Sequence, residues 1–213
     1  MDHVVSGVGV LDKAIALLDE IAARQPVSFI ELQSAVRFPK TTTHRLLAAL
    51  ETHGMVRRDS DGLLFSGPRF GEAALSQIAT PILRHLSEVT GESSQLFVRR
   101  GQQRVAIVSI ESGAELRTHV PLGAVYTIEK GSAGKLLIED ATALKRGWSE
   151  SVGERAAGTA SVSAPIYNDG HVVAAVCLSG PINRISDTPG RRYAKRVVRA
   201  AQDIQKALGS LHY

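Results

Sequence analysis

The most constraining feature of this sequence is the segment RFPKTTTHRLLAALETHG, residues 37–54. Leu46, Leu47 and Leu50 are spaced to form the buried face of a helix that begins at Pro39 or Lys40. Its first turn nevertheless carries three consecutive threonines, which are mediocre helix formers. A residue choice that costs helix stability indicates that this turn has another task.

Two further helices are predicted before this segment, and a hairpin after it. Ser28 and Glu31 form a capping box that opens a short helix ending near Val36, and a turn of three or four residues leads into the threonine helix. Strands at 55–58 and 63–65 flank the turn DSDG, completing a winged helix-turn-helix. The first helix is predicted to bury the apolar positions Leu11, Ala14, Ile15, Leu18 and Ile21.

The exposed face of the threonine helix suits the major groove of DNA. With Thr43 at the centre of the buried face, short polar side chains and one arginine point outward. Threonine can contact phosphates, base edges or the thymine methyl group, and Arg45 can contact guanine. No Ser, Thr, Asp or Asn stands at the cap position just before Pro39, so the first N–H groups of the helix remain available to a phosphate. The predicted DNA-contacting residues are Ser28, Lys40, Thr41, Thr42, Thr43, His44, Arg45, Arg57, Arg58 and Arg69.

The alternative is a surface helix that its threonines merely cap and decorate. The order of capped short helix, tight turn, helix and basic hairpin favours DNA binding. The net charge of +4 is too small to decide this by itself.

Bulk composition indicates a soluble, cytoplasmic protein with two domains. Hydrophobic residues make up 44% and charged residues 22% of the 213 positions, and no apolar run approaches the ~20 residues of a membrane span. The N-terminus lacks the basic start of a secretory signal. The single cysteine, Cys177, excludes an intramolecular disulfide and fits a reducing compartment.

The second half of the chain has an α+β pattern. Helices are predicted over 70–79 and from a cap at Thr80 to Gly91, then strands at 94–100, 104–112 and 116–120. A short helix starts near Ser132, two strands flank the turn NDG, and a long helix runs from Pro189 to Leu208.

Small polar side chains alternate along the two strands that flank this turn. If the hairpin loop has three residues, 169–171, Ser161 pairs with Ser179 and Ser163 with Cys177. A two-residue loop would scatter these four side chains. In the paired register they form a donor-rich patch that can hold a carboxylate or amide. The alternative is a tightly packed interior in which the serines bond to the backbone.

Nearly the whole chain resembles the IclR-type transcription regulators. The first half, from GVGVLDKA through FPKTTTHRLLAALETHG to GPRFGEAA, is similar to their DNA-binding part, and KGSAGKLLI, GTASVSAPI and VVAAVCLSGP to their effector-binding part. The resemblance implies a winged helix-turn-helix (1–69), a linker helix (70–80) and a GAF-like effector domain with an antiparallel sheet (81–213). It places Ser132, Ala133, Ser161, Cys177 and Ser179 in the effector pocket; Ser163 shares their patch, and Leu116 and His119 on a neighbouring strand are further lining candidates.

The resemblance also implies partners and a mode of action. It predicts a homodimer or tetramer on a near-palindromic double-stranded DNA operator, acting as a repressor and controlled by an amino acid or organic acid. GVGVLDKA and VTGESSQLF most resemble actinobacterial regulators of leucine or tryptophan biosynthesis. Relative to the family pattern, the chain lacks about ten residues near 77–78 and part of a helical stretch at 140–145.

No catalytic constellation, metal site or cofactor is predicted. GSAGKLL resembles a P-loop fragment, but Glu129 replaces its first glycine and Leu136 its magnesium-binding Ser or Thr. The alternative function is a small-molecule-binding protein or esterase-like enzyme with a helical interaction module. That function would depend on Ser161 or Cys177 rather than on Arg45.

Overall fold

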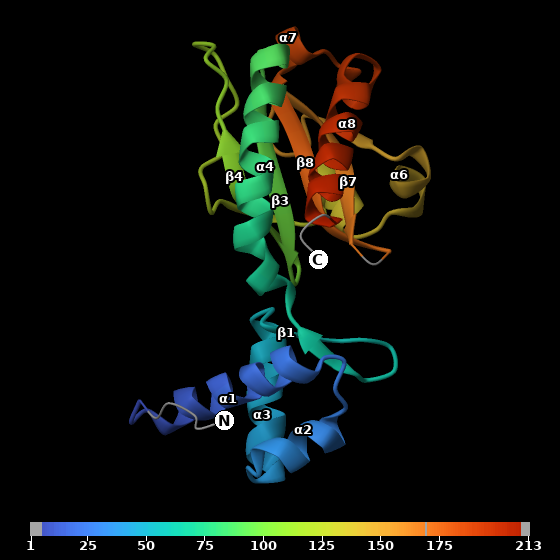
Figure 1. The fold of residues 1–213 in the computed structure, drawn as a ribbon. Coiled ribbons are helices and arrows are strands. Elements are labelled where there is room, and N and C mark those ends of the chain that lie inside the picture. Colours follow the sequence, from blue (N-terminus) through green and yellow to red (C-terminus); the bar gives the residue numbers. More distant parts are fainter. Residues whose placement is uncertain (1–5, 169, 210–213) are drawn as a thin grey trace. The chain divides into compact units, whose positions relative to one another are not determined.

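The computed structural model describes residues 6–168 and 170–209. The chain forms two compact units, which meet in the sequence between Ala73 and Ala74 and are described separately here. Figure 1 shows the first unit in blue to teal and the second in green to red.

The first unit is the predicted winged helix-turn-helix. Its helices are α1 (Gly9–Arg24), α2 (Phe29–Val36) and α3 (Lys40–Thr52), followed by the hairpin β1 (Val56–Arg58) and β2 (Leu64–Ser66). The predicted capping box starts α2, since the Glu31 amide donates to Ser28 Oγ and the Ser28 amide to Glu31 Oε2. Three residues separate α2 from α3. The core of this unit contains Leu17, Ile21, Val27, Leu32, Val36, Leu47, Leu50, Val56 and Leu64.

The predicted buried face of α1 is partly wrong. Ala16, Leu17 and Ile21 are its buried residues, whereas Leu11 and Ile15 remain 51% and 47% exposed. The helix carries apolar residues on more than one side, and α2 and α3 cover only one of them. Leu11 and Ile15, one turn apart, leave exposed apolar surface on α1, and Val8 and Val10 at its start are exposed as well.

One long helix, α4 (Pro68–Thr90), replaces the two helices predicted over 70–91. Thr80 does not cap a new helix, because its hydroxyl donates to the Ser76 carbonyl 2.7 Å away, one turn earlier in the same helix. Pro81 removes one backbone hydrogen bond, but Ala79 and Leu83 on either side are fully buried in the core of the second unit. Tertiary packing therefore carries the helix through the proline.

The second unit is built around a six-stranded antiparallel sheet in the order β5-β4-β3-β8-β7-β6. Its α4 and α8 pack on one face of this sheet, where Figure 1 shows them in front of the strands, and α5 covers the other. The strands are β3 (Ser93–Arg100), β4 (Gln103–Ile110), β5 (Val125–Thr127), β6 (Ser149–Val152), β7 (Thr159–Asn168) and β8 (His171–Pro181). The helices are α5 (Ser132–Leu137), α6 (Ala141–Arg146), α7 (Ile182–Ile185) and α8 (Pro189–Gly209).

Residues 116–120 were predicted to form a strand and do not. Side-chain hydrogen bonds fix this segment instead, because Ser93 Oγ donates to the Thr118 carbonyl and Ser109 Oγ to the Val120 carbonyl. The edge of the sheet next to β4 is formed by β5, further along the chain. The short elements β6, α6 and α7 were not predicted, since none is long enough to show a clear period.

The predicted register of the β7–β8 hairpin is confirmed, although by a different route. Ser161 pairs with Ser179 and Ser163 with Cys177. The two strands stay paired up to Asn168 and His171, so the connection is shorter than the three residues predicted, and Asp169 lies outside the described residues. A register shift between Ile166 and Tyr167 compensates for the difference. The shift places Val173 against the α4–α8 core, on the opposite face of the sheet from Ala175, whereas uninterrupted alternation would put both on one face.

Candidate functional site

The outer face of α3 matches the surface that the sequence predicts for a DNA-reading helix. Thr41, His44 and Arg45 are exposed and Thr42 is half-buried. Pro39 occupies the cap position, and no side chain accepts a hydrogen bond from the first turn. The helix therefore begins with a basic residue, Lys40, and with backbone N–H groups free for an anion.

Thr43 does not belong on this surface, and its predicted contact with DNA is wrong. Its side chain is fully buried, and its hydroxyl lies 3.4 Å from the Pro39 carbonyl. A hydroxyl in that position satisfies the helix backbone of its own first turn. Thr43 supports the reading face from beneath.

Ser28 and His44 both make local contacts that position the helices. The Ser28 hydroxyl is 2.6 Å from Glu31 Oε2 within the capping box. The His44 ring stacks on Phe29 with centroids 4.1 Å apart, which joins α3 to the start of α2. Both residues lie near the reading face, and each already has a structural partner.

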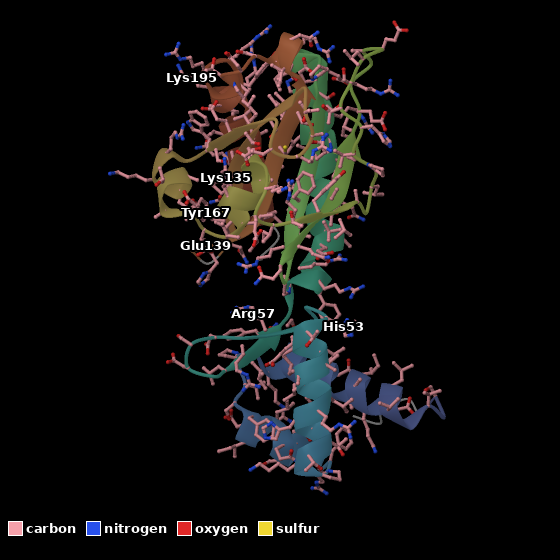
Figure 2. All side chains as sticks on the ribbon, turned by 180° about the vertical axis from the view of Figure 1, so that it is seen from behind. His53, Arg57, Lys135, Glu139, Tyr167 and Lys195 are labelled. Carbon is pink, nitrogen blue, oxygen red and sulfur yellow. The ribbon has the colours of Figure 1, made fainter. Side chains whose placement is uncertain are left out.

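The wing carries basic side chains in three different settings. Arg57, labelled in Figure 2, lies on β1 with its guanidinium 3.9 Å from the centroid of the Phe65 ring. Arg58 pairs with Glu51 at 2.9 Å, an exposed ion pair worth about 0–1 kcal/mol that a phosphate could replace. Arg69 is exposed at the start of α4, 3.5 Å from the His53 carbonyl.

The second unit brings six of the eight predicted effector residues together between α5 and the sheet. Ser132 Oγ lies 2.7 Å from both Ser161 Oγ and Ser163 Oγ, and 4.0 Å from Cys177 Sγ. Ala133 is fully buried in the next position of α5. Ser179 is hydrogen-bonded to Gln95 on β3 at 3.0 Å. We call this group, Ser132, Ser161, Ser163, Cys177 and Ser179, the serine cluster.

Two buried polar atoms in this unit have no hydrogen-bond partner among the described residues. Gln95 Nε2 lies next to Ser179 of the serine cluster, and Thr118 Oγ1 belongs to a residue that borders a separate cavity and accepts from Ser93 through its backbone carbonyl. Rotating the Gln95 amide would only exchange which of its atoms is unpaired. Buried unpaired donors are rare and mark places where a ligand or water binds. Sequence analysis missed Gln95, although a glutamine inside the strand SSQLFV was a visible signal.

Leu116 and His119 lie apart from the serine cluster. Leu116 is 61% exposed and borders a cavity of about 610 Å³ together with Thr118, Thr159 and Pro181. His119 is exposed, with Nδ1 2.7 Å from Glu111 Oε1. In the described residues no hydrogen bond joins either side chain to the cluster. Their prediction rested on a strand at 116–120, which the structure does not contain.

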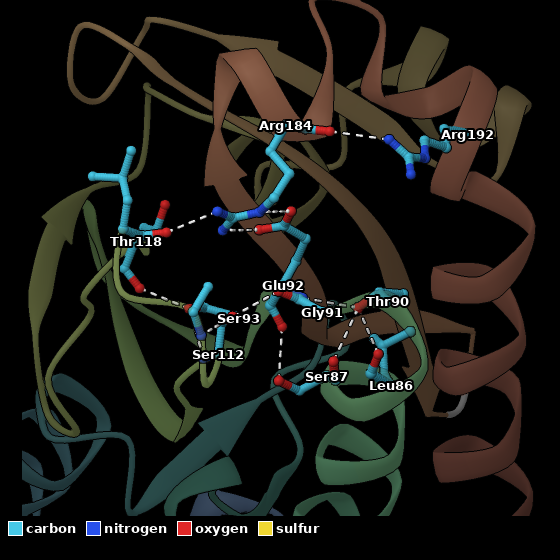
Figure 3. Close-up of polar contacts among 12 residues, drawn as sticks. Leu86, Ser87, Thr90, Gly91, Glu92, Ser93, Ser112, Thr118, Arg184 and Arg192 are labelled. Atoms are coloured by element: carbon cyan, nitrogen blue, oxygen red, sulfur yellow. Dashed lines mark hydrogen bonds and ion pairs between the residues drawn. The ribbon is translucent and has the colours of Figure 1, made fainter.

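An ion pair between a buried carboxylate and a half-buried arginine supports this end of the sheet (Figure 3). Glu92 is 1% exposed, and its two oxygens lie 2.6 Å and 2.9 Å from Nε and Nη2 of Arg184. Arg184 Nη1 also donates to the Leu116 carbonyl. The hydrogen bond to Glu92 raises the pKa of Arg184 above its ordinary value. This pair ties α7 to the start of β3 and to the loop that borders the cavity.

The described residues contain neither a cluster of three or more potential metal ligands nor a helix with the length and apolarity of a membrane span. The arrangement offers hydroxyl, amide and guanidinium donors, which are groups that bind polar small molecules.

Sequence comparisons match both units. The sequence model of the IclR helix-turn-helix domain matches residues 10–60, and that of the bacterial transcriptional regulator IclR C-terminal domain matches residues 70–143 and 136–206. The two segments of the second match overlap at residues 136–143, from the end of α5 into α6, next to the stretch at 140–145.

Individual relatives align over nearly the whole chain. The transcriptional regulator BhcR of Paracoccus denitrificans is 26% identical over 93% of this chain and 86% of its own length. The transcriptional repressor IclR of Escherichia coli is 26% identical over 94% of this chain and 90% of its own. Both alignments, 241 and 247 positions, exceed the 213 residues of this chain, which therefore lacks segments that these relatives have.

Solved structures share the fold. An IclR-family regulator from a Rhodococcus species superimposes with a TM-score of 0.61 at 29% identity, over 95% of this chain and 94% of that one. An IclR homologue from Microbacterium hydrocarbonoxydans, solved with 4-hydroxybenzoate, has a TM-score of 0.59 at 16% identity over 94% and 99%.

A winged helix-turn-helix joined to a sheet domain with a buried donor cluster defines a ligand-responsive DNA-binding regulator. The chain belongs to the IclR family of transcription regulators. It is a regulator with an effector-binding domain, not an enzyme.

Proposed function

We propose that the chain is a repressor of metabolic genes that binds a near-palindromic operator and responds to a small effector. The observation that carries this proposal is the exposed, short and polar outer face of α3, whose first turn has no side-chain cap. Thr41, Thr42 and Arg45 would meet base edges in the major groove. Several relatives are named as repressors, which favours that sign of regulation.

Contacts with the DNA backbone would come from basic residues around this face. Lys40 begins α3, Arg57 and Arg58 lie on the wing, and Arg69 starts α4. Each would neutralise phosphates without reading sequence, so together they set the non-specific affinity and its salt dependence. Ser28 and His44 would make further contacts with DNA at the margin of this surface.

A dimer would double the length of DNA that is read. One recognition helix contacts too few base pairs for useful specificity, and a two-fold protein matches a near-palindromic site. Support comes from exposed apolar side chains at and just before the start of α1, where Val8, Val10, Leu11 and Ile15 are 47% to 65% exposed in the single chain. Two such dimers could pair as a tetramer.

The effector would bind between α5 and the sheet, at the serine cluster. This assigns DNA binding to residues 1–69, a linker to 70–80 and effector binding to 81–213. The ligand would be an amino acid or an organic acid, and the resemblance of GVGVLDKA and VTGESSQLF favours leucine or tryptophan biosynthesis genes as targets. The protein would act in the cytoplasm, where its DNA lies.

The assignment of the reading helix is tested by the base preference of an Arg45→Ala variant. Binding to the DNA upstream of the protein's own gene would be compared across single base-pair substitutions. We expect a loss of about 1–3 kcal/mol and a relaxed preference at one position of each half-site. Arg24→Ala, which removes an exposed arginine paired with Glu20 on α1, is the matched control. Unchanged affinity and preference in Arg45→Ala would refute the role of α3.

A further inference from the structure

Arg104 is a buried cation that forms no ion pair with a carboxylate in the part of the chain that the structure describes. It lies on β4, is 3% exposed, and its guanidinium carbon is 4.8 Å from the centroid of the Phe97 ring and 5.3 Å from that of Tyr126. Among the described residues it donates one hydrogen bond, from Nε to the Thr127 carbonyl at 3.4 Å, and forms no ion pair. Its two terminal nitrogens are therefore left without an acceptor.

The surroundings of Arg104 carry an excess of positive charge. The Arg155 guanidinium lies 5.4 Å from the centroid of the same Tyr126 ring. The nearby carboxylate, Glu154, is already bound to Lys135 Nζ at 2.6 Å and to the Gly131 amide at 3.0 Å. Burial, with a further contribution from Arg155, lowers the pKa of Arg104. Three cations, Arg104, Lys135 and Arg155, thus lie near one carboxylate, Glu154. A bound anion would balance the remaining positive charge.

Arg104 borders the serine cluster. A Cβ atom placed on Gly131 would lie 2.9 Å from Arg104 Nη2, so the guanidinium lies close to the backbone of Gly131. The next residue is Ser132, the centre of the cluster, whose hydroxyl lies 4.0 Å from Cys177 Sγ. A ligand at the serine cluster can therefore reach the guanidinium.

We propose that Arg104 recognises a carboxylate of the effector and that the ligand is a small organic anion. The inference rests on the proposed role of this domain in effector binding. A guanidinium binds a carboxylate through two parallel hydrogen bonds, and the two terminal nitrogens of Arg104 have that geometry to offer. A zwitterionic amino acid would bring an ammonium group into a cluster of cations whose carboxylate is already engaged. An organic acid is therefore preferred over an amino acid.

The segment between β6 and β7 borders this site. Residues 153, 154 and 156–158 are exposed, and Glu154 holds the segment to α5 through Lys135 and Gly131.

The first test needs no knowledge of the natural ligand. In the full chain without ligand, Arg104→Met is expected to keep or raise the thermal unfolding midpoint, because it removes a buried charge that has no partner. Arg99→Met, at the paired position on β3, is the control for introducing methionine at an exposed site. A lower midpoint for Arg104→Met than for Arg99→Met would make Arg104 a structural residue and overturn the proposal.

The second test measures charge selectivity. The probes are pyruvate, 4-methyl-2-oxopentanoate and 4-hydroxybenzoate, compared with neutral 4-hydroxybenzamide and zwitterionic leucine, each up to about 10 mM. At least one carboxylate is expected to raise the unfolding midpoint of the unmodified protein, and the amide and leucine are expected to do less. Arg104→Met should weaken the binding of that carboxylate at least about tenfold, and Arg104→Lys should weaken its binding less.

Three results would overturn the proposal: no carboxylate effect on the unmodified protein, an equal effect of the amide or leucine, or an equal effect on Arg104→Met. Operator binding is measured in parallel on the same preparations. A failure to bind DNA would contradict the proposed function and leave the carboxylate result standing, so the two failures remain distinguishable.

Discussion

The hydroxyl of Ser132 lies 2.7 Å from that of Ser163, and this contact joins α5 to the buried face of β7. Ser163 is fully buried and Ser132 is 1% exposed, so water does not compete for the hydrogen bond. Ser132 makes an equally short contact with Ser161, which is only half-buried. The Ser132 side chain therefore contacts both Ser161 and Ser163, two successive residues of β7 that face α5.

Ser132→Ala is expected to lower the free energy of unfolding by about 1–3 kcal/mol, because it leaves the buried Ser163 hydroxyl without this partner. Ser161→Ala removes a hydroxyl that solvent partly reaches and is expected to cost less. Urea denaturation of both variants measures the difference. An equal loss in the two variants would show that burial of Ser163 does not set the strength of the contact.

Arg184→Met is expected to destabilise the second unit by about 3 kcal/mol, since it leaves the buried Glu92 carboxylate unpaired. The double variant Glu92→Gln with Arg184→Met should recover part of this loss by removing the charge. Arg192→Met, an exposed arginine that donates to the Arg184 carbonyl, should change stability by less than about 0.5 kcal/mol. Equal losses of stability in Arg184→Met and Arg192→Met would contradict the importance of the ion pair.

Glu154 predicts a small pH dependence of stability. Burial acts to raise its pKa, but hydrogen bonds from Lys135 and from the Gly131 amide outweigh this effect, so the pKa lies below the ordinary 4.5. A carboxyl with a lowered folded-state pKa stabilises the fold above its unfolded pKa, and this contribution is lost as the pH falls through the folded value. Glu154→Gln should thus be less stable than the unmodified protein at pH about 7, and the gap should narrow below pH about 4.

Denaturant titrations at both pH values measure that gap, with Glu88→Gln on the exposed face of α4 as the control. A gap that stays constant or widens in acid would show that the Glu154 contacts do not stabilise the carboxylate.

Gly134→Ala is expected to disrupt α5, because an added Cβ would lie 1.9 Å from the Ile128 carbonyl oxygen. Such overpacking against backbone typically costs about 1–3 kcal/mol. Gly71→Ala in α4 meets open space and should instead stabilise by about 0.5–1 kcal/mol. Thermal unfolding followed by circular dichroism separates the two, and a stable Gly134→Ala would mean that α5 can shift away from residue 128.

The first unit could be predicted from local signals, since each element has one. The capping box at Ser28, the leucine spacing of α3 and the turn DSDG each specify structure within a few residues. The error concerned α1, where periodicity gives an apolar face but cannot say whether the same chain covers it. Leu11 and Ile15 show this limit.

The second unit depended more on contacts between distant residues. The register of Ser161 with Ser179 followed from strand alternation, although an unforeseen shift at Ile166 was needed to produce it. Pro81 suggested a helix boundary that packing overrode. Arg104 in β4 and Glu92 just before β3 were missed, because a charged residue looks exposed until the fold shows what covers it.

Binding of the full-length protein to DNA from its own upstream region, measured by fluorescence anisotropy against salt, tests the central claim most directly. We expect tight binding that exceeds binding to scrambled DNA, with a steep negative dependence on salt. Arg57→Ala should weaken binding to both DNAs alike and reduce the salt slope by about 1. Absence of binding at low salt, or equal affinity for the two DNAs in the presence of the carboxylates tested above, would contradict a sequence-specific regulator.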